Sequence, residues 1–328
     1  MRLLKYPILL QEEIFSNMEY ETIFPLSLMS RNVLKVLKQL NWKPVEVAFV
    51  FDSDRFHIHF GDSTISSYLI SKSFVWQQTS THLFDYADYE TETVYNFEIN
   101  GGSRREILLR MYKHFSELFQ KCPKLKFCAR IDTSDMNFYV PIPSLNIATF
   151  KEVSANDLTT FMRNHLDLKL LVLDEKPLGE IPDIINIRNM RVVCFEKNFL
   201  DYIPHFKGVN AYFYGYTAAN DIHEFIDGWL NGKYPDNLRL IHIEKEYGRQ
   251  FRLDLLENYR QNQWDLNRMP LEYELDERDK CYSQFPGPFK MENAVYVQRE
   301  SDGKILSLQS ISDIFIGCVW NREDVFRE

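Results

Sequence analysis

Apolar positions in the first forty residues recur at intervals of three and four, which is the spacing of one face of an α-helix. They form three runs, at residues 8–18, 23–28 and 33–40, and a polar break at residues 19–22 separates the first two runs. Pro7 precedes the first run and suits the first turn of a helix. We predict three short helices. Helices this short cannot cover so much apolar side chain among themselves, so the surplus must face a partner or the rest of the chain.

The next part of the chain predicts strands and a loop. Residues 45–52 and 56–60 are rich in Val, Phe and Ile and read as two strands with a short turn between them. Residues 61–92 are polar and irregular, which predicts a loop, and residues 93–99 predict another strand.

A repeated pattern of short apolar strands fills the second half of the chain. It follows a helix predicted over residues 103–121, which begins with a capping box formed by Ser103 and Glu106. The predicted strands begin near residues 125, 168, 190, 209 and 238. Helices are predicted between them at residues 156–166, 218–230 and 253–261.

Strands that recur about every 20 to 29 residues, with helices or loops between them, are typical of leucine-rich-repeat solenoids. No Asn occupies the usual ladder position, so the repeat is irregular. The predicted fold class is α+β or α/β. A small three-helix domain over residues 1–42 precedes an irregular leucine-rich-repeat-like β/α domain over residues 43–328.

Composition narrows the classes of partner. The chain has 328 residues, of which 45% are hydrophobic and 15% aromatic, and its formal net charge is −9. Nucleic acid is therefore excluded as the main partner, because phosphate binding needs clustered Lys and Arg. The five cysteines are odd in number and no pair has Cys-x-x-Cys spacing, which indicates reduced thiols in a cytoplasmic or nuclear protein. We expect neither a signal peptide nor a membrane span.

Candidate chemistry is sparse. The sequence has no Gly-rich phosphate loop, no Gly-x-Ser-x-Gly elbow and no His-Glu-x-x-His pair. His57 and His59 lie two residues apart and could share a metal, but no third ligand follows at a recognisable spacing. Cys281 could form a thiolate pair with His242 or His223 only if the fold brought them together. We predict no catalytic residue, no cofactor and no metal.

The N-terminal pattern resembles an F-box. The residues that carry the resemblance are Tyr6-Pro7, Leu9-Leu10, Ile14-Phe15, Met18 and the segment Leu-Ser-Leu-Met-Ser-Arg at residues 26–31. Tyr6 departs from the family, which usually has Leu before the proline. The other interpretation of this segment is an ordinary helical hairpin that packs on the domain after it.

The F-box resemblance implies docking on a Skp-family adaptor protein and, through it, on the cullin of a cullin–RING ubiquitin ligase. The apolar anchors for that adaptor would be Pro7, Ile8, Leu10, Ile14, Phe15, Met18, Ile23 and Leu26.

The segment at about residues 195–270 resembles the F-box-associated type-two domain. The resemblance rests on the strands near residues 209 and 238, the helix between them, a hairpin at Arg299 to Gly303 and a final Val319-Trp320. Asp302-Gly303 between two strand-like runs predicts this hairpin independently.

The second resemblance implies a C-terminal domain that binds a protein target for ubiquitination. Strand alternation suggests target-binding side chains at Tyr212, Tyr214, His242 and Glu244. Two other functions stay open: a repeat-type interaction scaffold outside the ubiquitin system, and an enzyme with its site on the concave face.

Overall fold

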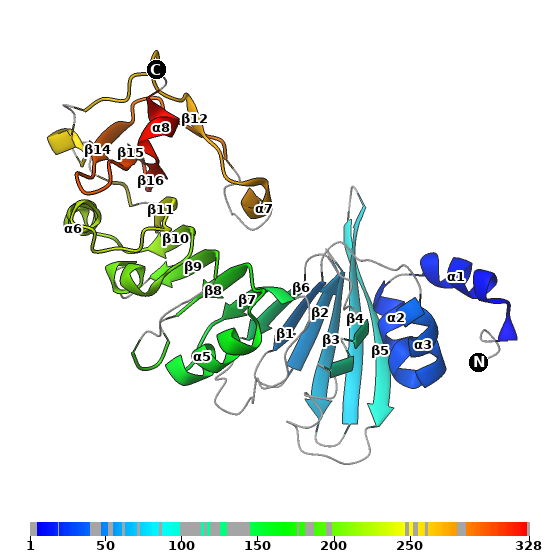
Figure 1. The fold of residues 1–328 in the computed structure, drawn as a ribbon. Helices are drawn as coiled ribbons and strands as arrows, with labels where there is room; N and C mark the ends of the chain where they lie inside the picture. The colour runs from blue at the N-terminus through cyan, green and yellow to red at the C-terminus, as the bar shows by residue number, and fades with distance from the viewer. Residues whose placement is uncertain are drawn as a thin grey trace. The chain divides into compact units, whose positions relative to one another are not determined.

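A computed structural model gives the structure of the chain. The residues that it describes are 5–18, 20–39, 47–51, 55–60, 63–70, 73–84, 87–98, 113–114, 117–118, 125–129, 145–175, 177–180, 187–194, 199–246, 249–251, 255–259, 262–280 and 287–326. The chain divides into two compact units, Met1–Lys151 and Glu152–Glu328. The boundary predicted after residue 42 therefore lies inside the first unit. Helices and mixed sheets are both present, so the fold is α+β (Figure 1).

The three predicted N-terminal helices are present as α1 (Ile8–Ser16), α2 (Tyr20–Met29) and α3 (Arg31–Gln39). Pro7 is the N-cap of α1, one position before the first turn, and its carbonyl oxygen accepts hydrogen bonds from the backbone N–H groups of Leu10 and Gln11. The most buried side chains of these helices are Phe15, Ile23, Phe24, Val33 and Leu37.

Helices α2 and α3 also pack on a later segment of the first unit. The Ser27 hydroxyl lies 2.7 Å from His114 Nε2, and Lys38 Nζ lies 2.6 Å from a carboxylate oxygen of Glu117. Burial lowers the pKa of His114 to about 4. The described part of the predicted 103–121 helix, residues 113–114 and 117–118, is helical. The N-terminal helices thus pack on a later segment of the first unit, as the helical-hairpin interpretation predicts.

The sheet of the first unit has the order β7-β6-β1-β2-β3-β4-β5. Its strands are β1 (Val47–Phe51), β2 (Arg55–Phe60), β3 (Ser63–Ile70), β4 (Ser73–Phe84), β5 (Ala87–Glu98), β6 (Leu125–Ala129) and β7 (Leu145–Phe150). Strands β1 to β5 are antiparallel to one another, whereas β6 pairs in parallel with β1 and β7.

The loop predicted over residues 61–92 is wrong, because most of this stretch belongs to β3, β4 and β5. Its Thr, Tyr, Phe and Val residues favour strands, and the interleaved Ser and Gln residues conceal the alternation. The long antiparallel ladder that β4 and β5 form over twelve residues each satisfies the backbone hydrogen bonds of this polar sequence.

The second unit begins with the predicted repeats. Helix α5 (Ala155–Asn164) precedes β8 (Leu170–Leu173), β9 (Asn189–Cys194) and β10 (Asn210–Gly215), and α6 (Ala219–Leu230) precedes β11 (Leu240–Lys245). The strands β8 to β11 lie side by side in chain order and are parallel. The predicted strands and the two predicted helices 156–166 and 218–230 are confirmed. The helix predicted over residues 253–261 is wrong in its described part, which holds only the 3₁₀ turn Glu257–Tyr259.

Three antiparallel strands complete this sheet, β14 (Val295–Gln298), β15 (Ile305–Ile311) and β16 (Ile314–Trp320), and β16 pairs with β11. The remaining elements are the 3₁₀ turns Phe199–Asp201 and Ile203–His205, α7 (Glu277–Lys280), α8 (Arg322–Val325) and the small pair of β12 (Glu272–Tyr273) and β13 (Phe289–Lys290).

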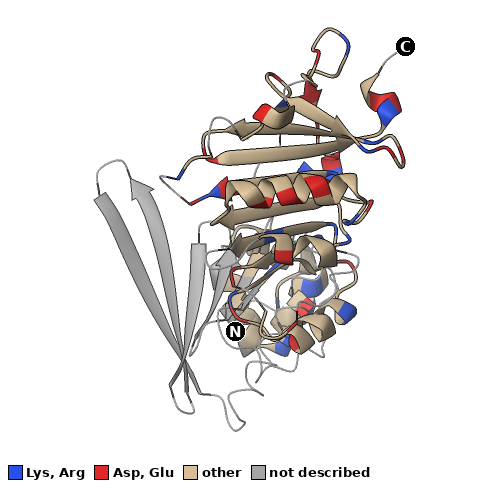
Figure 2. Ribbon diagram, turned by 90° about the vertical axis from the view of Figure 1, so that its left-hand side faces the viewer, with Lys and Arg blue, Asp and Glu red and all other residues tan. Residues whose placement is uncertain are grey.

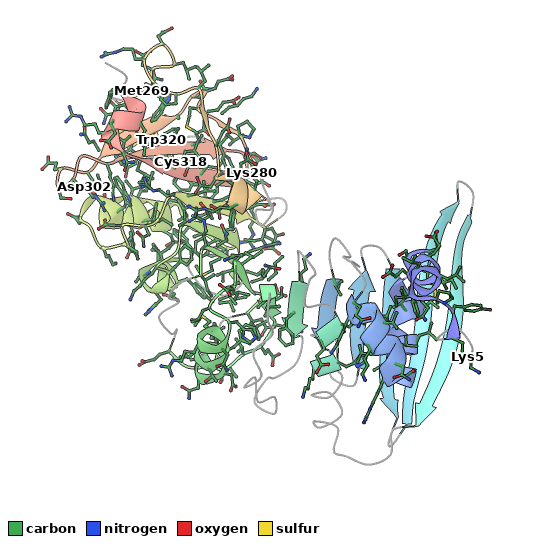
Figure 3. All side chains as sticks on the ribbon, turned by 45° about the vertical axis from the view of Figure 1, so that its right-hand side comes forward. Lys5, Met269, Lys280, Asp302, Cys318 and Trp320 are labelled. Atoms are coloured by element: carbon green, nitrogen blue, oxygen red, sulfur yellow. The ribbon has the colours of Figure 1, made fainter. Side chains whose placement is uncertain are left out.

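Different elements cover the two faces of this sheet. On one face Phe213 contacts Phe199, which in turn contacts Phe225 of α6. The other face carries a buried cluster that includes Tyr212 and side chains from the segment 262–291. Figure 3 labels Met269, Cys318 and Trp320 of this cluster. Since neighbouring residues of a strand point to opposite faces, Tyr212 and Phe213 mark the two sides.

A buried polar chain links the strand starts to the covering segment. Asn210 Nδ2 donates to Asn189 Oδ1 at 2.8 Å, and Asn189 Nδ2 donates to the Lys169 carbonyl and to Asp279 Oδ1. Arg188 Nε donates to the same Asp279 oxygen at 2.6 Å, and Asp279 is only 1% exposed. The Asn pair thus lies at the starts of β9 and β10, away from the ladder position at which the sequence lacks Asn.

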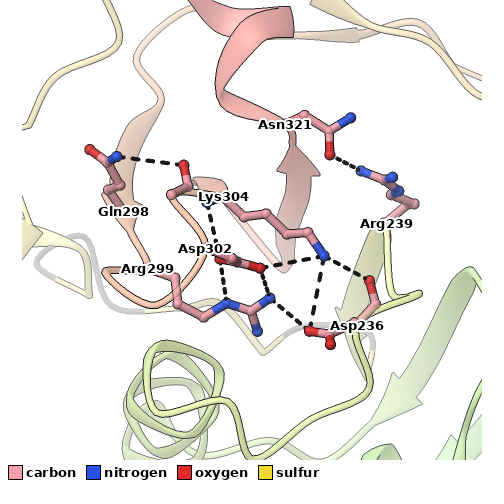
Figure 4. A network of polar contacts seen from close by, with 8 residues as sticks. Asp236, Arg239, Gln298, Arg299, Asp302, Lys304 and Asn321 are labelled. Atoms are coloured by element: carbon pink, nitrogen blue, oxygen red, sulfur yellow. Dashed lines mark hydrogen bonds and ion pairs between the residues drawn. The ribbon is translucent and has the colours of Figure 1, made fainter.

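The hairpin predicted at Asp302-Gly303 is confirmed, because β14 and β15 pair on either side of it. Its loop is longer than two residues, and Gly303 adopts the left-handed conformation, with φ of 71°. Arg299 makes two hydrogen bonds to the Asp302 carboxylate and one to Asp236 (Figure 4). Its guanidinium also lies 4.9 Å from the Trp229 ring centre. The contact with Arg299 holds the pKa of Asp302 well below its usual value. This network fixes the hairpin to the end of α6.

Candidate functional site

An exposed run of apolar residues precedes and begins α1. The exposed fractions are 51% for Tyr6, 46% for Ile8, 75% for Leu9 and 48% for Leu10, and Pro7 between them is exposed too. We call Tyr6, Pro7, Ile8, Leu9 and Leu10 the N-terminal ridge, which directly follows Lys5, labelled in Figure 3. Contiguous apolar surface of this kind marks sites of interaction with other molecules.

The structure separates the predicted adaptor anchors by burial. Pro7, Ile8 and Leu10 belong to the exposed ridge, and Ile14, Met18 and Leu26 are half-buried. Phe15 and Ile23 are 0% exposed, so these two are corrected from contact residues to core residues. Apolar and polar residues are interleaved around α1, and the side that carries Gln11 and Phe15 is the one turned inward. Leu9 is the most exposed residue of the ridge and was not among the predicted anchors.

The predicted target-binding residues lie together, as their alternation suggested, because Tyr212 is opposite His242 and Tyr214 is opposite Glu244 in the register of β10 and β11. The exposed fractions of Tyr212 and His242 are only 3% and 2%. The correction here is that the segment 262–291 covers their end of the strands. Tyr214 and Glu244 are half-exposed.

The uncovered part of this face is a row of side chains that crosses five strands. The register places the following five residues directly opposite one another, one per strand: Val193, Tyr214, Glu244, Ile314 and Ile311. We call them the open row. The first four are half-buried and Ile311 is 60% exposed. The next row inward, in which Tyr212 and His242 lie, is largely covered, so exposure rises toward the carboxyl ends of β9, β10 and β11.

Charges at the open row are unbalanced. Partial burial raises the pKa of Glu244, the nearby Asp313 carboxylate raises it further, and Arg191 lowers it in part. Glu244 therefore lies near one other carboxylate and one guanidinium, beside the apolar side chains of the row. Sequence reasoning did not identify Val193, Ile311, Ile314 or Arg191. The alternation of isoleucine at residues 314 and 316 was the available signal.

Buried His242 predicts acid sensitivity of the second unit. Burial lowers the pKa of His242 to about 4, whereas an unfolded histidine titrates near pH 6.5. Between these values the unfolded chain binds more protons, so the free energy of unfolding falls as the pH falls, by at most about 3 kcal/mol for this group.

We expect His242→Gln to flatten the dependence of stability on pH between pH 7 and pH 4.5. Denaturant unfolding at several pH values, followed by tryptophan fluorescence, measures this slope. An unchanged slope in the variant would contradict the assignment to His242.

The comparisons with known proteins found no matching family model, no matching curated protein and no matching solved structure. Within the described ranges, no group of three or more His, Cys, Asp or Glu side chains could hold a metal ion. His57 and His59 belong to β2, which pairs with β1 and β3. No helix among the described residues has the length and apolar character needed to cross a membrane. Cys281, which was considered as a thiolate partner of His242 or His223, lies outside the described residues.

Proposed function

We propose that the protein is a substrate-recognition adaptor of a cullin–RING ubiquitin ligase that acts in the cytoplasm or the nucleus. The N-terminal helices of residues 1–42 would act as an F-box and bind a Skp-family adaptor protein. The β/α repeats of the second unit would act as the leucine-rich-repeat-like domain that binds a protein target. The three-helix pattern, the F-box-like residues and the order of the two parts support this proposal.

The observation that carries the proposal is the exposure of the N-terminal ridge. Ile8, Leu9 and Leu10 are between 46% and 75% exposed, while Phe15 in the same helix is fully buried. Burial of apolar surface contributes about 25 cal/mol of favourable free energy for each Å², which favours binding of a partner that covers the ridge. The binding energy of such interfaces is concentrated in a few residues.

The double substitution Leu9→Asp and Leu10→Asp tests the proposed docking. We expect it to abolish co-purification with a co-expressed Skp-family adaptor, because truncating one anchor of an interface costs about 2 kcal/mol or more. Both residues are exposed, so the unfolding temperature of the chain should change little. The matched control is Lys35→Asp with Gln39→Asp, which introduces charge at exposed polar positions of α3.

Adaptor binding that survives the ridge substitutions would refute this docking model. Failure of the unsubstituted chain to bind the adaptor would instead favour the second candidate, a repeat-type interaction scaffold outside the ubiquitin system. In that candidate the open row of the second unit is the binding surface, and the N-terminal ridge has no role in binding.

A further inference from the structure

We infer that the open row binds an extended segment of a partner protein with the pattern apolar-x-basic-x-apolar, in which Glu244 receives the basic side chain. The inference rests on the proposed function in that the partner would be the ubiquitination target. It specifies which part of the second unit holds that target and the chemistry of the target segment.

The position of the row in the sheet supports a binding role. Parallel strands are normally covered on both faces, and ligands of open α/β sheets bind at the carboxyl ends of the strands. Here α6 lies over one face, and among the described residues side chains from 264–275 and 289–291 cover the amino-terminal half of the other. The uncovered half is the one at the carboxyl ends of β9, β10 and β11, where the open row lies.

The spacing of the row sets the length of the segment. Neighbouring strands are about 4.8 Å apart, so the five strands span roughly 19 Å, the reach of about six extended residues. In an extended chain, side chains that point the same way are about 6.8 Å apart. A basic side chain over Glu244 therefore places the apolar side chains two positions before and after it near Tyr214 and Val193 on one side and near Ile314 and Ile311 on the other.

Charge decides the central position of the segment. Glu244 is half-buried, and the Asp313 carboxylate and the Arg191 guanidinium lie near enough to act on its charge. A lysine or arginine from the partner would form an ion pair with Glu244 between the apolar side chains of the row. An acidic residue there would be repelled. A second copy of this chain is a less suitable occupant, since the same two carboxylates would meet their own copies across a two-fold axis.

A random dodecapeptide library displayed on phage and selected on the full-length protein tests the inference. We expect the enriched peptides to carry Lys or Arg with apolar residues two positions to either side. On the variant Glu244→Lys with Asp313→Lys, we expect acidic residues to replace the basic one in the enriched peptides. A peptide selected on the wild type should bind this variant about tenfold or more weakly in a fluorescence anisotropy titration.

The matched control moves the same charge change to the opposite face. Glu224 and Asp227 are exposed on the outer side of α6, where Figure 2 shows acidic residues. We expect Glu224→Lys with Asp227→Lys to leave peptide binding within about twofold, because rim charges remote from a site act weakly at physiological salt. Equal weakening by both variants would show that only the net charge matters and would overturn the inference.

A near-isosteric variant of the row separates the loss of charge from the loss of the fold, and adaptor binding separates this inference from the proposed function. The near-isosteric variant Glu244→Gln with Asp313→Asn should also lose affinity, and its unfolding temperature shows whether it is folded. Enriched peptides without the pattern, or a wild-type dimer that the row variants dissociate, would overturn the inference. Row variants should keep the adaptor and ridge variants should keep the peptide. An unsubstituted chain that binds the adaptor but selects no peptide with the pattern would count against this inference alone, and one that selects such peptides but does not bind the adaptor would count against the proposed function alone.

Discussion

Replacing Gly208 with alanine is expected to destabilise the second unit by about 3 kcal/mol or more, because overpacking that also displaces backbone lies at the severe end of single substitutions. A Cβ atom at this position would lie 2.1 Å from the backbone oxygen of Ile187 and 2.4 Å from the Phe206 ring. The backbone carbonyl of Arg188, the residue after Ile187, accepts hydrogen bonds from the N–H groups of Val209 and Asn210. The segments at Ile187 and Gly208 therefore cannot move apart without losing hydrogen bonds at the start of β10.

Denaturant and thermal unfolding measure the effect of this substitution. The control is Gly232→Ala. Gly232 has a φ of 69° and nothing within 4 Å of an added Cβ, so alanine there costs only the backbone strain of about 1 kcal/mol. If the two variants unfolded at the same denaturant concentration, the close approach at Gly208 would have no energetic importance.

The second large effect is expected for Arg188→Met, which should lower the free energy of unfolding by about 3 kcal/mol. Asp279 is 1% exposed, and its carboxylate accepts hydrogen bonds from Arg188 and Asn189. Methionine keeps much of the volume of the side chain but leaves this carboxylate buried beside the neutral Asn189 amide, without the Arg188 charge. Arg188 also forms an ion pair with the exposed Asp276, which should contribute little.

A matched control for this variant lies on the same segment. Arg278 pairs with Asp276 at 3.1 Å, but its side chain is 70% exposed, so Arg278→Met should cost less than about 1 kcal/mol. The double variant Arg188→Met with Asp279→Leu should recover part of the loss, because it removes the buried charge along with its partner. A double variant no more stable than Arg188→Met alone would contradict this account.

Local pattern predicted the elements whose sequence has one dominant period. The three N-terminal helices and the parallel strands β8 to β11 have apolar residues at regular spacing, and they form where expected. The strands β3 and β4 and the first part of β5 were missed because their Ser, Thr and Gln residues hide the alternation, and their stability comes from pairing with neighbouring strands. The strand predicted over residues 93–99 corresponds to the second part of β5. The short strand β7 gave no separate signal from the sequence around it.

The sites were predicted less completely than the elements. Apolar and polar residues are interleaved around α1 without a single apolar face, so its sequence could not show that Phe15 turns inward while Leu9 turns outward. Strand alternation placed Tyr212 and Tyr214 on the same face correctly. Only the structure shows that a segment fifty residues further along the chain, at Trp264, covers the first of them and leaves the second open.

The packing of α2 and α3 on residues 113–118 has a consequence for how fragments of this protein should be designed. A fragment that begins at residue 43 would lack the contacts of Phe24 and Ser27 with His114 and the ion pair of Lys38 with Glu117. Such a fragment would expose interior surface, adhere to unrelated proteins and give false partners. Point substitutions in the N-terminal ridge of the intact chain are expected to remove adaptor binding without exposing this interior surface.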